Sequence, residues 1–269
     1  MNRSHPVVEL TADHPGFHDR LYRQRRDAIA RAAIEFRAGD AVPNIDYTEE
    51  EQAVWREVWR HLDPLHARYA CSEYRDAAAE IALSRERIPQ LGEVNEIIEP
   101  VEGFRMLPVA GLVTAGAFLT QLGSSVFLST QYMRHHSVPL YTPEPDVIHE
   151  LVGHAATFMH PDFAKLNRAF GSAVERAKSL DEIERIGRVY WYTLEFGVVR
   201  ERGAIRVYGA GLLSSFGELG RFETEERLEP WDVEKIASTP YDPSRYQQTL
   251  FVAPGFAQMT RDVLAWLGG

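Results

Sequence analysis

Apolar residues recur at helical spacing through much of the first half of the chain. Over 19–36 the apolar positions are Leu21, Ala28, Ile29, Ala32, Ala33 and Phe36. Over 47–65 they are Val54, Trp55, Val58, Trp59 and Leu62. Thr48 and Glu51 add a capping-box pair at the start of the second segment. Residues three and four apart share a helical face, so both segments are predicted to be amphipathic helices, with the tryptophans in the core.

The pattern changes after residue 103. Residues 104–111 (FRMLPVAG) are predicted to form a short strand that enters a glycine turn. Residues 114–134 are predicted to be helical, with an interruption near Gly123. Asp146 follows two prolines and is predicted to cap a helix that ends near Phe158.

The second half continues with helices and a few short strands. Ser179 and Glu182 form a second capping-box pair, which predicts a helix through Glu195. Residues 204–211 (AIRVYGAG) are predicted to be a strand before a glycine-rich turn, and residues 250–267 a strand followed by a helix. The predicted fold class is therefore mainly α, or α+β with short strands.

The domain organisation follows from the even spread of these elements. No β-α-β alternation is apparent, which argues against a Rossmann fold or a TIM barrel. There is no repeat, low-complexity tract or Gly/Ser linker. We expect a flexible N-terminal tail over 1–10 and a single domain over 11–269.

Composition narrows the class of protein. The chain has 269 residues, of which 45% are hydrophobic and 25% charged, as in globular proteins. Its net charge of −10 argues against nucleic acids and anionic membrane surfaces as partners. The single cysteine, Cys71, excludes an intramolecular disulfide, and no apolar run has the length of a signal peptide or a membrane span. These features predict a cytoplasmic protein.

The segment PDVIHELVGH, residues 145–154, carries the chemistry most open to interpretation. Its histidines, His149 and His154, are five residues apart, whereas the zinc-protease signature spaces them by four. On an ideal α-helix such residues are separated by about 140°. Gly153 precedes the second histidine and permits a helix end, a kink or a π-type turn. A metal site at these histidines would thus differ from that of the zinc proteases.

A third metal ligand is suggested by Glu195, which ends the apolar, aromatic segment YWYTLEFG. A carboxylate in such a segment is expected to be buried, and burial is costly unless the group is paired or binds a metal. Two imidazoles and one carboxylate form the facial triad of non-haem Fe(II) oxygenases, but the same set serves catalytic zinc. The ligand types alone leave both metals open.

Five blocks of the sequence resemble the tetrahydropterin-dependent aromatic amino acid hydroxylases. They are GFRMLPVAGL, TQYMRH, YTPEPDVIHELVGH, YWYTLEFG and YGAGLLSSFGEL, and their order also agrees with that family. The resemblance extends from residue 12 to residue 253, nearly the whole chain. It implies the helical basket fold of the family's catalytic domain.

The resemblance also implies a role for each candidate residue. His149, His154 and Glu195 would hold Fe(II), with positions left open for O₂. The tetrahydropterin (tetrahydrobiopterin or a bacterial equivalent) would contact Gly111, Leu112, Val113, Thr114, Phe118, Glu150 and Tyr190. The amino acid substrate would contact Arg134, Thr142, Pro145, Trp191 and Ser214. Arg134 would bind the substrate carboxylate with its planar guanidinium, and Phe118 would stack on the pterin.

The family's reaction inserts one oxygen atom of O₂ into an aromatic ring. The expected substrate is L-phenylalanine and the expected product L-tyrosine. Tryptophan hydroxylases usually carry Phe at the position of Trp191, and tyrosine hydroxylases carry Asp near the position of Pro243. No acidic group is evident that would receive a phenol. The alternatives are a phenylalanine 3-hydroxylase, a tryptophan hydroxylase, a zinc hydrolase with the same three ligands, and a catalytically silent binding protein.

The sequence departs from the family in two places. Gly116 and Ala117 replace the Arg-Asp pair that commonly precedes the pterin-stacking Phe, and Ala155 and Ala156 replace a Val-Pro pair after the second histidine. We expect neither a regulatory domain ahead of the catalytic one nor a terminal heptad helix, and therefore a monomer or weak dimer. Pterin-recycling enzymes would act separately.

Overall fold

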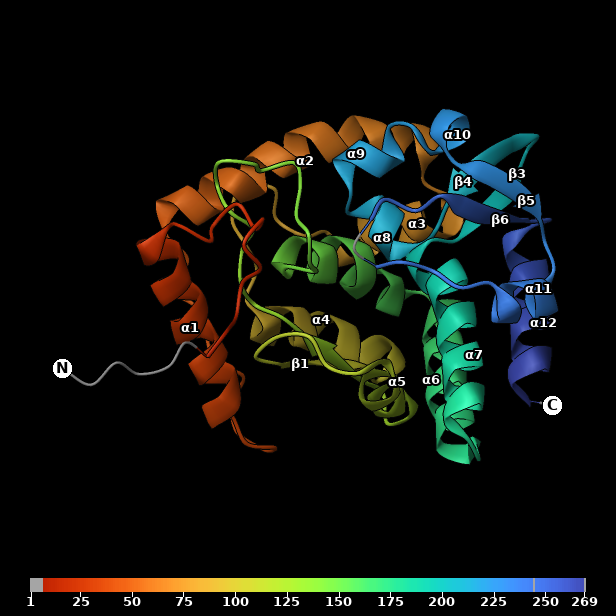
Figure 1. Ribbon diagram of the computed structural model, residues 1–269, viewed down its shortest axis with the longest axis horizontal. Helices are drawn as coiled ribbons and strands as arrows, with labels where there is room; N and C mark the ends of the chain where they lie inside the picture. Colours follow the sequence, from red (N-terminus) through yellow and green to blue (C-terminus); the bar gives the residue numbers. More distant parts are fainter. Residues whose placement is uncertain (1–6, 244, 269) are drawn as a thin grey trace.

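The computed structural model describes residues 7–243 and 245–268, and most of them are helical (Figure 1). The longer helices are α1 Arg20–Glu35, α2 Glu49–Tyr69, α3 Ser72–Ile81, α4 Leu91–Glu102, α5 Ala115–Gly123, α6 Pro161–Arg176, α7 Leu180–Tyr190 and α12 Phe256–Gly268. The shorter ones are α8 Ala210–Leu213, α9 Phe216–Leu219, α10 Phe222–Glu225 and α11 Val233–Ser238. There are also two short π-helices, η1 His149–His154 and η3 Trp191–Glu195, and a 3₁₀ helix, η2 Ala155–Met159, in the described residues.

Helix α2 agrees with its predicted pattern. All five apolar positions of its stripe are buried, and Thr48 and Glu51 make both hydrogen bonds of the capping box. Helix α1 agrees in its bounds but not in its buried face. Leu21 is 77% exposed and Ala28 is also exposed, whereas Arg26, Ile29 and Ala30 are buried. The apolar stripe predicted for α1 was therefore partly wrong, because a buried arginine occupies the face that packs inward.

A small β-α-β unit lies ahead of the η1 segment. Strands β1 Arg105–Pro108 and β2 Val126–Ser129 pair in parallel, and α5 connects them. The prediction of a helix over 114–134 was correct only as far as Gly123, where α5 ends. The prediction that β-α-β alternation is absent was likewise wrong at this one place. The two-stranded sheet positions the loop between β1 and α5 at the edge of the fold.

A second sheet has the strand order β4-β3-β6-β5. Its strands are β3 Val198–Glu201, β4 Ala204–Val207, β5 Arg227–Pro230 and β6 Thr249–Ala253. Strand β3 pairs antiparallel with β4 and parallel with β6, which also pairs in parallel with β5. The predicted strands over 204–211 and 250–267 are thus present, at the right of the molecule in Figure 1.

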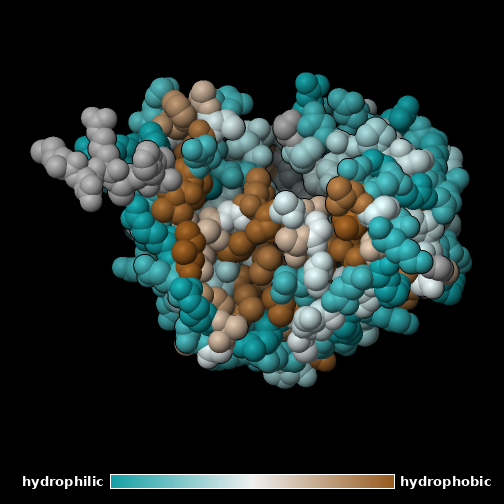
Figure 2. Space-filling view, turned by 60° about the horizontal axis from the view of Figure 1, so that its bottom comes forward, coloured by the Kyte–Doolittle hydropathy of each residue, from teal (hydrophilic) through white to brown (hydrophobic). Residues whose placement is uncertain are grey.

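Helices α6 and α7 lie side by side in Figure 1, and α5 packs against α6. The shared core includes aromatic side chains that are fully buried, among them Trp55, Phe158 and Phe170. Ser179 caps α7 as predicted, but the Glu182 carboxylate accepts from the backbone of Lys178 and not of Ser179. Figure 2 turns the lower side of Figure 1 forward and shows apolar side chains gathered on that face.

The predicted N-terminal tail lies partly outside the described residues, because 1–6 are not described. The backbone N–H groups of Val7 and Val8 donate to Asp27 Oδ1 of α1 at 2.9 and 3.0 Å. Residues 7 and 8 are therefore attached to the domain. Among the described residues, no helix is both long and apolar enough to cross a bilayer.

Candidate metal centre and substrate cavity

His149 and His154 lie at the two ends of η1, which is a π-helix. Its i→i+5 hydrogen bonding, seen between Ala155 N–H and Glu150 C=O, brings residues five apart over one another. Gly153 allows this turn to approach α8, because a Cβ at that position would lie 2.8 Å from the Ala210 carbonyl oxygen. The π-type turn that the glycine suggested is confirmed, and it explains the five-residue spacing.

Glu195 reaches the two histidines from the end of η3, a second π-helix that continues α7. The Nε2 atoms of His149 and His154 are 3.1 Å apart. Glu195 Oε1 lies 3.1 Å from His154 Nε2, and Oε2 lies 3.5 Å from His149 Nε2. Three ligand atoms on one face of a metal, each bonded at about 2.1 Å, are roughly 3 Å apart. The three side chains therefore have the arrangement of a facial metal-binding triad.

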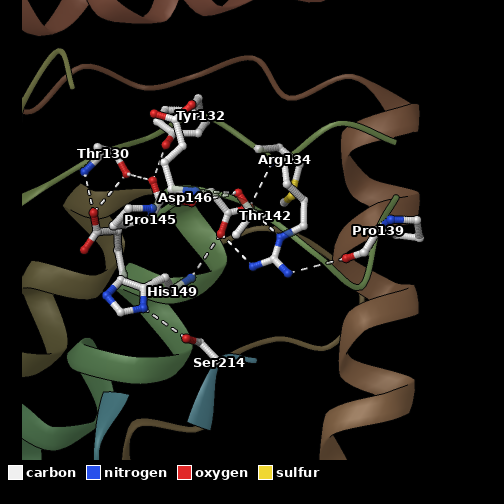
Figure 3. Close-up of polar contacts among 12 residues, drawn as sticks. Thr130, Tyr132, Arg134, Pro139, Thr142, Pro145, Asp146, His149 and Ser214 are labelled. Carbon is white, nitrogen blue, oxygen red and sulfur yellow. Dashed lines mark hydrogen bonds and ion pairs between the residues drawn. The ribbon is translucent and has the colours of Figure 1, made fainter. Parts of the chain in front are cut away.

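The surroundings shift the pKa values of the three ligands in different directions. Burial would lower the pKa of His154, but the neighbouring Glu195 outweighs it and raises that pKa, so a metal would displace a proton from this imidazole. Burial lowers the pKa of His149 to about 4, so its imidazole is neutral near pH 7. Burial would raise the pKa of Glu195, but the neighbouring histidines outweigh it and hold the pKa below its usual value. Ser214 Oγ donates to the Ala210 carbonyl and accepts from His149 Nδ1 at 3.0 Å (Figure 3). This contact fixes the His149 tautomer and leaves Nε2 free for the metal.

Two of the predicted pterin residues lie beside the histidines and are buried. Glu150 Oε1 accepts hydrogen bonds from Thr130 N–H at 3.0 Å and Thr130 Oγ1 at 2.9 Å. Burial raises the pKa of Glu150 to about 7. The Tyr190 hydroxyl is buried without a hydrogen-bond partner among the described residues. An unpaired buried hydroxyl is costly, so the fold leaves a donor here that suits a polar ligand.

The remaining predicted pterin residues lie around the start of α5. Phe118 is half-buried, and its ring meets Phe127 and Tyr190 edge-on at centroid distances of 5.3 and 5.7 Å. Leu112 is 73% exposed and Val113 is 40% exposed. Gly111 is partly exposed. Thr114 is the N-cap of α5, and its side chain accepts a hydrogen bond from the α5 backbone. Phe118 thus faces the buried tyrosine, while the loop before it is open to solvent.

A cavity of about 660 Å³ opens over the triad. All five predicted substrate residues line it: Arg134, Thr142, Pro145, Trp191 and Ser214. His149, Glu195 and Leu112 line it as well, so the cavity joins the metal ligands to the outer loop. Its volume is in the range of small-molecule sites. Of the pterin candidates in the loop over 111–114, Leu112 is the one that reaches the lining.

Arg134 is buried, and its guanidinium already makes an ion pair with Asp146. Its Nε and Nη2 atoms donate to the two carboxylate oxygens of Asp146, each at 2.8 Å (Figure 3). Its Nη1 has only a long contact of 3.5 Å to the Pro139 carbonyl. The bidentate contact that was expected with a substrate carboxylate is thus made with Asp146. Nη1 is the guanidinium nitrogen left for a ligand. Asp146 also caps the next helix through His149 N–H at 3.2 Å, as predicted.

Trp191 is held by residues that the sequence did not single out. Its indole stacks on Tyr241 with centroids 4.1 Å apart and planes at 9°. Its Nε1 donates to Gln247 Oε1 at 2.6 Å, and the Gln247 backbone N–H donates to Glu218 Oε1 at 2.7 Å. Gln247 lies 56 positions from Trp191, and no local pattern marks it.

The sequence showed no acidic group that would receive a phenol, but two acidic residues besides Glu195 line the cavity. Glu144 and Glu218 both belong to its lining. Each has a partner: Glu144 accepts from Arg26 at 3.1 Å, and Glu218 accepts from the Gln247 backbone. Burial raises the pKa of Glu218. Pro243 also lines the cavity and brings no carboxylate to it.

The fold and this site match one known family. The model of the biopterin-dependent aromatic amino acid hydroxylases matches residues 4–268 of the chain. The chain therefore belongs to this family, as the five sequence blocks indicated.

Two kinds of curated relative are found at nearly equal identity. Tyrosine 3-monooxygenase of Schistosoma mansoni is 42% identical over 260 residues, which cover 95% of this chain and 56% of the relative. Phenylalanine-4-hydroxylase of Caenorhabditis elegans is 41% identical over 265 residues, which cover 96% of this chain and 58% of the relative. The chain thus spans between half and two thirds of the length of these relatives. Identity alone does not decide between their substrates.

Solved structures confirm the predicted fold class. A crystal structure of Chromobacterium violaceum phenylalanine hydroxylase with bound iron(III) and 7,8-dihydrobiopterin matches with a TM-score of 0.79 and 28% identity, covering 89% of this chain and 90% of that one. The apo structure of the cold-active phenylalanine hydroxylase from Colwellia psychrerythraea matches with a TM-score of 0.76 and 27% identity, covering 84% and 90%.

Proposed function

We propose that this protein is an Fe(II)- and tetrahydropterin-dependent monooxygenase that hydroxylates the ring of L-phenylalanine to give L-tyrosine. The observation that carries the proposal is the facial triad of His149, His154 and Glu195, which borders a cavity of about 660 Å³. Its ligand set leaves the other face of a metal open, as oxygen activation requires. Family membership favours an iron-dependent hydroxylase over a zinc hydrolase with the same three ligands.

The residues present fit both cofactors. The triad offers two imidazole nitrogens and one carboxylate at suitable separations, and these would hold the iron. The unpaired Tyr190 hydroxyl and the half-buried Phe118 ring offer a polar group and an aromatic surface to a pterin. When bound, iron and tetrahydropterin together supply the activation of O₂. The chain itself supplies position, orientation and shelter from water.

Substrate binding is assigned to the other residues that line the cavity. Arg134 Nη1 would meet the substrate carboxylate, because Asp146 occupies the rest of the fork. Thr142 and Ser214 line the same cavity and would contact the backbone of the amino acid. The flat surfaces of Trp191 and Pro145 would flank the aromatic ring. This arrangement orients the ring toward the triad.

Phenylalanine is preferred over tyrosine on the basis of the polar groups near the cavity. A site that accepts a phenol needs a free partner for the hydroxyl, because an unpaired buried polar group is costly. Glu144 and Glu218 are already paired, and Pro243 offers no side-chain acceptor. The expected ring position rests on the residues that follow His154. Ala155 and Ala156 are buried and lie outside the cavity lining, but their small side chains leave freedom next to His154, so meta-tyrosine is expected as a minor product beside para-tyrosine.

The proposal is tested with protein loaded with Fe(II) under anaerobic conditions. Phenylalanine, tyrosine and tryptophan are each supplied at equal concentration with a tetrahydropterin and air. Oxygen uptake that requires both pterin and phenylalanine, with para-tyrosine as product, is the expected result. Faster turnover of tyrosine or tryptophan would overturn the substrate assignment. Hydrolytic activity of zinc-loaded protein, without pterin-dependent oxygen uptake, would overturn the reaction class.

A further inference from the structure

A second group of metal-ligating side chains lies where α1 begins. Asp19, the N-cap of α1, meets His135 and His136, which follow β2. One ligand atom from each of the three lies within 4.8 Å of the others. None of the three belongs to the triad, so they constitute a separate donor set. Imidazole nitrogens and a carboxylate oxygen are ligand types that Zn²⁺ takes in proteins.

Asp19 and His135 are held in place by contacts that leave one ligand atom of each facing the other. Asp19 Oδ1 accepts from the backbone N–H groups of Leu21 and Tyr22 at 2.8 and 3.0 Å, while Oδ2 lies 3.3 Å from His135 Nε2. His135 is buried, and its Nδ1 lies 2.7 Å from Ser137 Oγ. The Ser137 backbone N–H also donates to His135 Nδ1 at 3.3 Å, which places the ring proton on Nε2, facing Asp19. A metal at Nε2 would require that proton to be on Nδ1 instead, where Ser137 Oγ can accept it.

His136 is the most accessible histidine of the group. Its ring centroid lies 4.3 Å from that of His135, and its side chain is 40% exposed. Glu50 Oε2, from α2, lies 3.1 Å from His136 Nδ1. A cavity of about 490 Å³ is lined by Asp19, Glu50 and His136. An ion from solvent therefore has a route to the group, with a further carboxylate beside it.

We propose that Asp19, His135 and His136 form a second metal site that binds a divalent transition metal such as Zn²⁺. Imidazole nitrogens favour Zn²⁺, Ni²⁺ or Cu²⁺ over Mg²⁺ and Ca²⁺, which prefer oxygen ligands. Tetrahedral ligands around Zn²⁺ are roughly 3.4 Å apart, and the three ligand atoms lie within 4.8 Å of one another, so the widest separation would contract by up to about 1.4 Å. The exposed His136 side chain supplies that movement by rotation.

The proposed site would tie the start of α1 to the segment that carries Arg134. His135 directly follows Arg134, whose side chain lines the substrate cavity, whereas Asp19 belongs to the N-terminal region. A ligand that binds only the folded protein stabilises it, so Zn²⁺ should raise the thermal midpoint. The triad is not part of this donor set, and the inference does not depend on the reaction proposed above.

Equilibrium dialysis against Zn²⁺ tests the site, with bound zinc and iron measured by elemental analysis of iron-loaded protein. The expected result is one equivalent of zinc bound while the iron is retained. Asp19→Asn keeps a side chain that caps a helix but loses the carboxylate, and His136→Ala changes an exposed ring. Each should weaken zinc binding at least about tenfold. Each should also abolish the zinc-dependent rise in thermal midpoint.

Two further variants separate this site from other zinc binding. His61→Ala is the matched control. His61 is partly exposed and lies 3.0 Å from the Glu57 carboxylate, but it belongs to neither of the three-residue donor groups among the described residues. The His61→Ala variant should bind zinc as the wild type does. Glu195→Ala should lose iron and keep the zinc equivalent. The proposal is overturned if the wild type binds no zinc beyond its iron, or if Asp19→Asn and His136→Ala bind it as tightly as the wild type. Loss of the zinc equivalent with Glu195→Ala would also overturn it.

Discussion

The guanidinium of Arg134 holds both carboxylate oxygens of Asp146, each at 2.8 Å, and both side chains are almost fully buried. Asp146 in turn accepts from the backbone N–H of His149 at 3.2 Å. The residue assigned to the substrate carboxylate is therefore joined, through a single aspartate, to the helix that carries the first metal ligand. Under the proposed function, the positions of substrate and metal would both depend on this buried ion pair.

Replacing Arg134 by Lys should weaken amino acid binding selectively. Lysine keeps the charge but cannot engage Asp146 with two donors and still present a third to a ligand. A charged hydrogen bond contributes about 1.5–3 kcal/mol, so kcat/KM for phenylalanine should fall roughly 10- to 100-fold. Steady-state kinetics with each substrate varied in turn would show KM rising for the amino acid and not for the pterin. The reverse pattern would show that Arg134 serves the pterin.

Gln247 should matter through the orientation of Trp191. Gln247→Leu removes the acceptor at 2.6 Å from the indole Nε1 and leaves that donor without its partner. We expect a rise of about fivefold in KM for phenylalanine, equivalent to about 1 kcal/mol. Trp191→Phe has no N–H group, so adding Gln247→Leu to it should change KM little further. Additive effects in this double-mutant cycle would contradict the link between the two residues.

The triad should account for the iron. His154→Ala and Glu195→Ala should each lose most bound iron and all pterin-dependent hydroxylation, with the helical content preserved in circular dichroism. His160→Ala is the matched control, because His160 caps α6 and is not in the triad. It should keep its iron and activity. Full activity in His154→Ala would rule out the ligand set.

Glu226 should make the protein less stable as the pH rises. Burial, with Glu218 and Glu225 nearby and Arg221 opposing them, raises the pKa of Glu226 to about 8. Between its ordinary pKa of 4.5 and about 8, the folded state keeps a proton that the unfolded state has lost, so stability falls as the pH rises through that window. Glu226→Gln should thus raise the thermal midpoint at pH 8 more than at pH 5. An equal effect at both pH values would count against the raised pKa.

Local patterns predicted the elements that obey a single periodicity. The stripe from Val54 to Leu62 gave α2 correctly, because its apolar residues recur at helical spacing and all are buried. Val126–Ser129 was wrongly assigned to a helix, because the interruption predicted near Gly123 was taken as a break within one helix and not as its end. Pairing with Arg105–Pro108, a contact across the chain, decides that this segment is a strand.

The sequence predicted a role for some residues of the site and missed the role of others. His149, His154 and Glu195 were found because their types and their motifs are distinctive. Asp146 was expected only as a helix cap, and its hold on Arg134 depends on a contact that no periodicity shows. Gln247 was missed for the same reason. Polar residues that position others carry no signal until the fold brings them together.

The most direct test is identification of the product formed from phenylalanine by the iron-loaded protein. Wild type and Glu195→Ala are incubated with phenylalanine, a tetrahydropterin and air, and the products are separated by chromatography against para- and meta-tyrosine. The account predicts mainly para-tyrosine from the wild type, a small amount of meta-tyrosine, and neither from the variant. A dominant meta product would overturn the ring position alone. If iron-loaded wild type forms no hydroxylated product from phenylalanine, tyrosine or tryptophan, the assignment of this site as a pterin-dependent hydroxylase is contradicted.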